Sequence, residues 1–526
     1  MPLLALHSLT LLGLPFRLTP GDLLEIEESG PYTRDPLRVL LILNPERVKR
    51  KLQDWLTQSL GFVKQAIRRN RLTDPRQLSL ALIARSQAGR PNVACGGRTS
   101  FDLLKPMLDT DTKSHEDALK INDYSIKNCK PGDPAAEQLA QGLPGLPRAL
   151  SDRMWLRLAA KMKCRARILR GDGQSVVTMA NEKKENPEVL GDVVIANGGF
   201  HTSGHFAFAG NEGFHDCKFG RSKDILGFEK VPKHIPNFEN DSYKHSLNFL
   251  RIDYIGTLAY FLLDVESPIP ELLLDDPEQY LSLINVGGGV AAFESMRYVG
   301  APISQYILAA RSADGEKNCD LEAYAFHCMR AYAHKPVEAR VLLISLLGSQ
   351  TTHPKIAQIV KETAFFSWLG LDGHTQFADR AMERVNLVQD ERRGKFSAFE
   401  HALEFTPHLE GLLHCLAALD AANDGPSKSS DPLTEGMVNG ARAVREDLKA
   451  RLGTDLTRHD PTNALYHTGG APNMVNATNR QSHKPWEFIW RVADKTSTGP
   501  GRSDPEAWDE YAKRFISDRL WTCHAT

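Results

Sequence analysis

The sequence lacks the features that mark secreted, membrane-spanning and strongly charged proteins. Its 526 residues include only 8 cysteines, scattered singly without a CxxC pair, which is too sparse for a disulfide framework. Lys and Arg number 64 against 65 Asp and Glu, so the net charge is −1 and no global excess of charge points to nucleic acid or membrane. We therefore expect an intracellular protein, the nucleus included, and any DNA-binding role must rest on a local patch.

Long hydrophobic runs are also missing. The one membrane-like stretch is Met1–Phe16, which has no Lys or Arg before its apolar run, no small-residue cleavage site, and contains His7 and Pro15. These departures favour a buried helix or strand over a signal peptide. No other run approaches the roughly 20 apolar residues that a membrane span needs, so we expect no membrane partner.

Hydrophobic residues make up 41% and charged residues 25% of the chain, which is the composition of a folded globular protein. Turn signals and periodicity divide it into an N-terminal mixed region (1–95), a linker-like excursion (96–150), an α/β core (151–300), a helical region (301–423) and a C-terminal helix with a Trp-rich tail (432–526). The expected strands fall in the first half and the helices in the second. This order indicates an α/β or α+β core with a large helical part.

Individual elements are predicted from the pattern of apolar residues. Short apolar runs bounded by turn residues predict strands at 37–43, 175–179 and 192–196. Apolar residues at spacings of three and four predict helices at 47–70 and 434–452.

A basic stretch without acids lies between 153 and 171. A helix through its first part would place Arg153, Arg157, Lys161 and Arg165 on one face, and such a stripe suits contacts to phosphates. The alternative is an ordinary solvated surface. The basic residues of the stretch are Arg153, Arg157, Lys161, Lys163, Arg165, Arg167 and Arg170.

An acidic turn comes directly after it, because Asp172 stands between two glycines at 171–173. A carboxylate just past a strand is well placed to bind a hard cation such as Mg²⁺ or Mn²⁺. A single carboxylate is not a metal site, however, and phosphoryl transfer with two metal ions needs several acids. Further acids are spaced along the expected helices around 374–420 and could complete such a site. They are Asp379, Glu383, Glu391, Glu400 and Glu404.

A cluster of histidines with one cysteine occupies 198–217. Imidazole and thiolate are good Zn²⁺ ligands, so His201, His205, His215 and Cys217 are candidates for a tetrahedral zinc site. The glycines of this stretch argue against a stable helix, and segment 197–245 is therefore predicted to be irregular. The alternative is a Gly/His loop whose histidines bond to the backbone or line a cleft.

Short motifs between residues 171 and 408 resemble those of a known family. Gly171–Gln174, Gly198–His201, Arg330–His334 and Phe405–His408 resemble segments of an uncharacterised domain of eukaryotic transposon-associated proteins, similar to transposases of the Kyakuja–Dileera–Zisupton type. The resemblance spans roughly residues 160 to 420 and implies an RNase H-like mixed sheet with a large helical insertion and a helical C-terminal part. In that fold, metal-binding carboxylates cut and join DNA.

Two departures from the family pattern bear on activity. The turn at 171–174 carries an extra glycine, and Gly199 stands where the family has an acid before Phe-His. Without that acid Asp172 lacks its nearest partner, and His201 could replace it only as a nitrogen ligand, whereas Mg²⁺ prefers oxygen.

The resulting hypothesis is a transposon-derived DNA-binding protein, either active or degenerate as a metal-dependent transposase or nuclease. If it is active, Asp172 is a metal ligand and a later acid, Glu383 or Glu400, completes the site. The alternative is a non-enzymatic interaction protein in which 198–217 forms a structural zinc site or a partner-binding loop. A third option, an enzyme acting on a small molecule in a His-rich cleft, has no motif that names its substrate.

Overall fold

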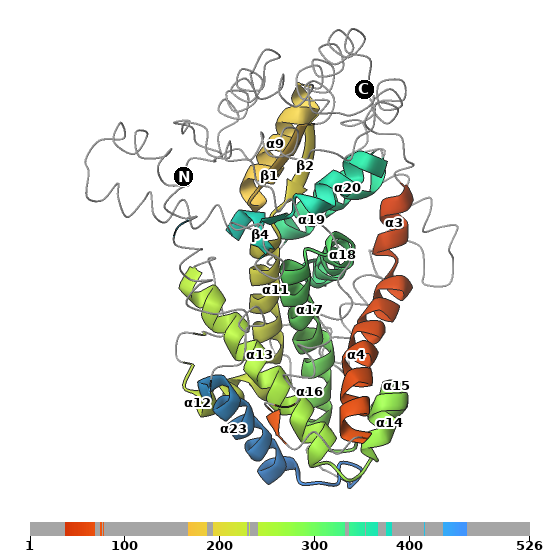
Figure 1. Ribbon diagram of the computed structural model, residues 1–526, viewed down its shortest axis with the longest axis vertical. Helices are drawn as coiled ribbons and strands as arrows, with labels where there is room; N and C mark the ends of the chain where they lie inside the picture. Colours follow the sequence, from red (N-terminus) through yellow and green to blue (C-terminus); the bar gives the residue numbers. More distant parts are fainter. Residues whose placement is uncertain are drawn as a thin grey trace, which may run out of the picture.

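The computed structural model of the chain describes residues 37–68, 74–75, 77, 167–186, 193–228, 231, 240–331, 336–352, 354–366, 375–380, 415 and 435–459. Most of the long helices run along the longest axis of the molecule, and a small parallel sheet lies at one end of it (Figure 1).

The elements in the first half of the described chain are α3 (Leu37–Leu43), α4 (Pro45–Arg68), β1 (Arg167–Gly171), α9 (Gly173–Glu185), β2 (Val193–Asn197), α11 (Gly199–Phe214), the π-helical turn η1 (His215–Phe219), α12 (Gly220–Leu226) and α13 (Asn240–Leu263). The elements in the second half are α14 (Pro270–Asp275), α15 (Pro277–Leu283), α16 (Gly287–Ser295), the π-helical turn η2 (Met296–Gly300), α17 (Ala301–Ser312), α18 (Gly315–Ala331), α19 (Pro336–Thr351), α20 (Pro354–Glu362), β3 (Phe365–Phe366), β4 (Gln376–Phe377) and α23 (Glu435–Leu452).

The parallel sheet consists of β1 and β2, joined by the crossover helix α9. Every residue of β2 is buried, as expected for a parallel strand covered on both faces. Helix α19 lies directly on it, since a Cβ at Gly348 would stand only 2.8 Å from the carbonyl oxygen of Ile195. The strand predicted at 192–196 is thereby confirmed with a shift of one residue.

The predicted RNase H-like mixed sheet is wrong for the part of the chain that the structure describes. That part contains one two-stranded parallel sheet and the two-residue antiparallel pair of β3 and β4, and the rest of its regular structure is helical. The strand expected at 175–179 belongs to helix α9 instead. Val176 and Met179, three residues apart, both face the core, which is a helical spacing.

Two other predictions of secondary structure are wrong. The apolar run 37–43 forms helix α3, in which Val39, Ile42 and Leu43 are buried, because a short apolar run is compatible with either a strand or a helix. Segment 197–245 was predicted to be irregular, but α11, η1 and α12 form one continuous helical stretch across residues 199–226 of it. The helices predicted at 47–70 and 434–452 are confirmed as α4 and α23.

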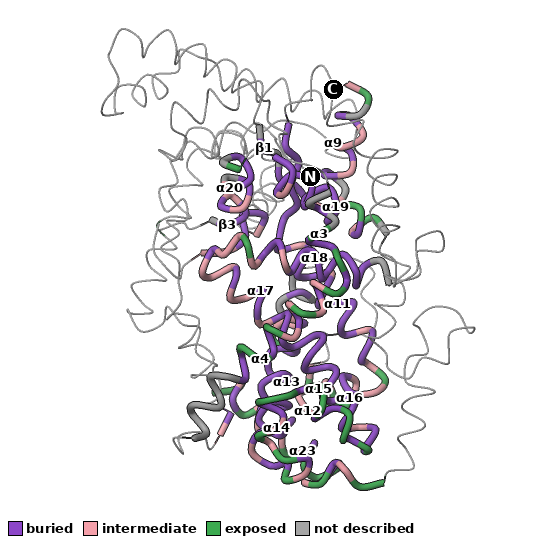
Figure 2. The backbone as a smooth tube through the Cα atoms, turned by 90° about the vertical axis from the view of Figure 1, so that its right-hand side faces the viewer, coloured by how far each residue is buried: buried purple, intermediate pink, exposed green. Residues whose placement is uncertain are grey.

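Buried residues line the long axis of the body (Figure 2). One hydrophobic core joins β2, α9, α11, α18 and α19, and a second fills the opposite end among α13, α14, α15, α16 and α23. The N-terminal helices belong to this body, because the ring of Trp55 in α4 lies 6.2 Å from that of Tyr324 in α18. None of the described helices is both long and apolar enough to cross a membrane.

A buried ion pair lies where α11 passes into α12. The π-helical turn η1 brings Lys218 into the interior, where its ammonium group contacts the carboxylate of Asp253 in α13. Both side chains are almost fully buried. Burial lowers the pKa of Lys218, while Asp253 opposes that shift. Lys218 lies within this π-turn, where the spacing of residues departs from that of the α-helix on either side.

Candidate functional site

The candidate site lies at the carboxyl edge of the β1–β2 sheet. The strands run parallel and end in register at Gly171 and Asn197. The N–H of Gly198 donates to the carbonyl oxygen of Gly171 over 3.2 Å, so the residues just past the two strands stay side by side. A helix begins directly after each strand, and this edge is where open α/β sheets bind their ligands.

Asp172 comes directly after β1, as the sequence predicted, and it caps helix α9. Its carboxylate accepts hydrogen bonds from the backbone N–H of Ser175, at 3.0 Å, and from the Ser175 hydroxyl. A carboxylate in this position satisfies an N–H that has no partner inside the helix. Asp172 therefore has a structural role in addition to any chemical one.

Asp379 holds the first turn of the second helix, α11. Its carboxylate accepts hydrogen bonds from the backbone N–H groups of Phe200 and His201, each at 3.1 Å. The same carboxylate lies 3.0 Å from Nδ1 of the His201 ring. Because Asp379 is 8% exposed and His201 15%, this pair is largely shielded from water. A carboxylate that bonds Nδ1 of an imidazole fixes the tautomer and orientation of the ring.

Two glycines make this contact possible. A Cβ at Gly198 would lie 2.1 Å from a carboxylate oxygen of Asp379, and a Cβ at Gly199 would lie 2.4 Å from the ring of Phe377. Gly198 thus leaves room for an acidic residue that arrives from a distant part of the sequence, and Gly199, where an acid was expected from the family pattern, leaves room for the Phe377 ring.

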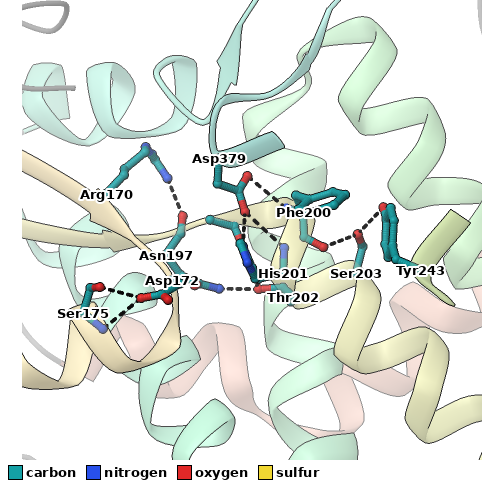
Figure 3. A network of polar contacts seen from close by, with 11 residues as sticks. Arg170, Asp172, Ser175, Asn197, Phe200, His201, Thr202, Ser203, Tyr243 and Asp379 are labelled. Carbon is teal, nitrogen blue, oxygen red and sulfur yellow. Dashed lines mark hydrogen bonds and ion pairs between the residues drawn. The ribbon is translucent and has the colours of Figure 1, made fainter. Parts of the chain in front are cut away.

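Neutral hydrogen bonds order the rest of the site (Figure 3). The amide of Asn197 donates to the Thr202 hydroxyl. The Ser203 hydroxyl lies 2.9 Å from the Tyr243 hydroxyl of α13 and donates to the carbonyl of Phe200. Burial raises the pKa of Tyr243 to about 12, so this phenol stays protonated at neutral pH.

Arg170 is the second-last residue of β1, and its side chain is buried. Its guanidinium donates to the backbone carbonyls of Asn197, at 2.8 Å, and of Val360. The sequence predicted Arg170 as a contact to phosphate, but its buried side chain is used inside the protein. Burial raises the pKa of Glu322 in α18 to about 7, and the positive charge of the Arg170 guanidinium opposes this rise.

The predicted zinc ligands are separated along the helix. His215 follows His201 by fourteen positions, roughly 21 Å along a helix axis. His205 lies 3.7 Å from a carboxylate oxygen of Glu338, and His215 lies 3.2 Å from that of its neighbour Asp216.

The thiol of the fourth predicted ligand, Cys217, donates to the carbonyl of Phe214, and burial raises its pKa to about 12. Within the described ranges, no three His, Cys, Asp or Glu side chains gather closely enough to hold a metal ion. The zinc site and the Mg²⁺ or Mn²⁺ site predicted with Asp172 thus find no ligand cluster in that part of the chain.

Several predicted residues lie outside the described part of the chain. They are the basic residues Arg153, Arg157, Lys161 and Arg165 and the acids Glu383 and Glu400. Arg167 is the first residue of β1.

Of the two buried carboxylates at this site, the sequence named Asp379 without its partner and missed Glu322. Asp379 was one of five acids spaced through the expected helices, and nothing in the spacing paired it with His201. Glu322 carried no signal, since a glutamate in a helical pattern is normally solvated.

Comparison of the chain with models of protein families, with curated proteins and with solved structures gives no match.

Proposed function

We propose that this protein binds nucleic acid and hydrolyses phosphodiester bonds at the carboxyl edge of the β1–β2 sheet. The observation that carries the proposal is the His201–Asp379 pair, in which a carboxylate held by two backbone N–H groups also bonds the imidazole at 3.0 Å. An imidazole oriented by a buried carboxylate is the standard arrangement of a general base.

The proposed step uses water as the nucleophile. His201 takes a proton from the water as the oxygen attacks phosphorus, and the bond from phosphorus to the leaving oxygen breaks. The proton then passes to the leaving oxygen, so the products are a phosphomonoester and an alcohol. Asp379 stabilises the imidazolium that exists between these transfers.

The choice of nucleic acid as substrate has two supports from the sequence. The basic stretch that begins at Arg153 leads directly into β1, whose other end carries Asp172. The short motifs similar to those of transposon-associated proteins indicate the same class of substrate. A transposon origin fits this proposal, whereas the RNase H-like fold forms no part of it.

The test is a cleavage assay on labelled single-stranded DNA, duplex DNA and RNA, each with Mg²⁺, Mn²⁺ or EDTA. We expect H201A to lower the cleavage rate by at least about 100-fold, the usual contribution of a general base. D379N should also lower the rate, because an amide favours the wrong tautomer. The matched control is H205A, since His205 lies one turn further along α11 with a similar exposure, 20% against 15%, and should cleave like the wild type.

A binding assay distinguishes the proposed hydrolase from the alternative, a non-enzymatic binding protein. If the wild type binds nucleic acid but cleaves none of the three substrates under any condition, hydrolysis is excluded and the non-enzymatic binding protein is the better description. Equal losses in H201A and H205A would also contradict the role of His201. Absence of binding at low salt would overturn the proposal as a whole.

A further inference from the structure

A pair of short helices at the end opposite the candidate site exposes two large hydrophobic side chains. Helices α14 and α15 follow each other there, far from the β1–β2 sheet (Figure 1). Ile269, just before α14, is 63% exposed, and Leu283, the last residue of α15, is 41% exposed. The described residues include only two other exposed hydrophobic side chains of this size, Leu41 and Val337. Single exposed apolar residues are normal, whereas a group of them marks an interaction site.

The backbone holds Ile269 and Leu283 near each other. The N–H of Leu456 donates to the carbonyl of Ser267 over 2.6 Å, and the carbonyl of Leu456 accepts from the N–H of Asn285 over 2.8 Å. Chains bonded in this way lie about 5 Å apart, so Ser267 and Asn285 stand roughly 10 Å from each other. Ile269 and Leu283 are each two residues further on, which adds at most about 7 Å on either side. Both therefore lie within the reach of one peptide of about eight extended residues.

The charged residues around this pair are acidic. No Lys, Arg or His occurs between Arg251 and Arg297. Arg297 pairs with Glu278, and Arg458 donates to the carbonyl of Leu452, so two cations stand against five exposed acids in these segments. Within the described ranges the acids do not gather into a metal-binding group, so their charge is spread over the surface. The exposed acids are Glu266, Glu271, Asp275, Asp276 and Glu278.

We propose that this surface, formed by residues 266–285, docks a basic peptide segment of another protein. Apolar residues of the peptide would cover Ile269 and Leu283, and its lysines or arginines would face the acids. Apolar contacts inside a polar rim are the usual composition of a protein interface, and complementary charge selects the partner. Nucleic acid does not fit this surface, because its phosphates carry the same sign of charge. The surface is thus separate from the proposed nuclease site and does not depend on it.

Fluorescence anisotropy with labelled model peptides tests the surface directly. The probe is a peptide of lysines with two leucines, long enough to span both side chains. One companion peptide has serine in place of each leucine, and a second has glutamate in place of each lysine. We expect the probe to bind and the serine peptide to bind at least about tenfold more weakly, because it buries less apolar area. The glutamate peptide should not bind, because like charges repel.

Apolar variants assign this binding to the proposed surface. The double variant I269S/L283S should bind the probe about tenfold more weakly than the wild type. The matched control is L41S/V337S, which removes the other two exposed hydrophobic side chains and should bind like the wild type. All four side chains are exposed, so neither double variant opens a cavity in the core.

Charge variants test the role of the acids. E266Q/E271Q should weaken binding at low salt and flatten its dependence on salt, as expected for charges at the rim of an interface. The matched control is E185Q/E316Q, which removes exposed acids of α9 and α18 and should leave both properties unchanged.

Two results would overturn the proposal. One is absence of probe binding by the wild type, and the other is equal binding by the wild type and I269S/L283S. Analytical ultracentrifugation examines the other possible occupant, a second copy of this chain. A dimer of the wild type that is lost in I269S/L283S would show that the surface serves self-association, which would also overturn the proposal. Failure of the cleavage assay would contradict the proposed hydrolysis alone and leave the docking surface standing.

Discussion

The carboxylate of Asp379 occupies the space that a side chain at Gly198 would need. The two residues are far apart in sequence, yet a Cβ on Gly198 would stand 2.1 Å from a carboxylate oxygen. The absence of a side chain at Gly198 therefore makes room for the acid from segment 375–380. This arrangement places a buried carboxylate at the N-terminus of α11, where negative charge is stabilised.

The first prediction concerns G198A. The backbone at Gly198 has φ −85° and ψ 123°, which alanine adopts freely, so the effect is steric. We expect the segment around Asp379 to be displaced at a cost of about 1–3 kcal/mol in the free energy of unfolding, with loss of any activity of His201. The control is G173A, whose added Cβ would meet only Val341 at 3.7 Å. Urea denaturation of the two variants compares them, and equal stabilities would refute the steric argument.

Local sequence signals predicted the elements that need no distant partner. Strand β2 was predictable because four consecutive apolar residues, Val193–Ala196, stand just before Asn197 and Gly198, and α4 because its apolar residues recur at helical spacing. Helix α11 was missed because its glycines lower helix propensity. They serve close packing instead, as at Gly210, where a Cβ would stand 2.7 Å from Val299. Tertiary contact outweighs local propensity here.

The candidate site was predictable only in part. Asp172 stood out because it lies between glycines just past an expected strand, and His201 stood out because it belongs to the His/Cys cluster at 198–217. The roles of Asp379 and Glu322 did not stand out, because both residues come from far along the chain and meet the site only in the folded protein. A buried carboxylate and a solvated one look the same in sequence, and burial is a property of the assembled fold.

The second prediction separates the capping role of Asp172 from a chemical one. D172A removes the acceptor of the Ser175 N–H and should lower the free energy of unfolding by about 1 kcal/mol, whereas D172N should retain most of the cap. If Asp172 also takes part in cleavage, D172N should lose activity while keeping its stability. Thermal unfolding and the cleavage assay, applied to both variants, test the two roles. A D172A protein as stable as the wild type would contradict the cap.

The third prediction concerns the pH dependence of stability. The pKa of Glu322 is raised from 4.5 to about 7 in the folded protein, so between these values the folded state holds a proton that the unfolded state has lost. Stability from this group is full below pH 4.5 and falls as pH rises towards 7, by roughly 3 kcal/mol in all. The difference in unfolding free energy between wild type and E322Q should vary with pH along this curve. A difference that is constant from pH 4.5 to 8 would contradict it.

The fourth prediction concerns the buried pair of Lys218 and Asp253. K218M leaves the Asp253 carboxylate buried without its cation, which should cost about 3–5 kcal/mol of stability. Adding D253L removes the stranded charge and should recover a large part of that loss. Urea denaturation of the two single variants and the double variant forms a complete cycle. A loss of stability in the double variant equal to or larger than the sum of the two single losses would show that the pair does not act as a unit.

The fifth prediction tests whether the basic stretch binds nucleic acid. Arg170 belongs to this stretch, but its side chain is buried, so we expect no phosphate contact from it. Replacing Arg157, Lys161 and Arg165 with Gln should weaken binding to all sequences alike, because phosphate contacts carry no base information. The slope of log affinity against log salt should shrink by roughly 0.9 for each contact to duplex DNA that is lost. R170Q should instead lower stability, since it leaves the carbonyls of Asn197 and Val360 without their donor. A salt titration of the triple variant, with thermal unfolding of R170Q beside it, separates the two effects. An unchanged salt slope in the triple variant would rule out phosphate contacts by this stretch.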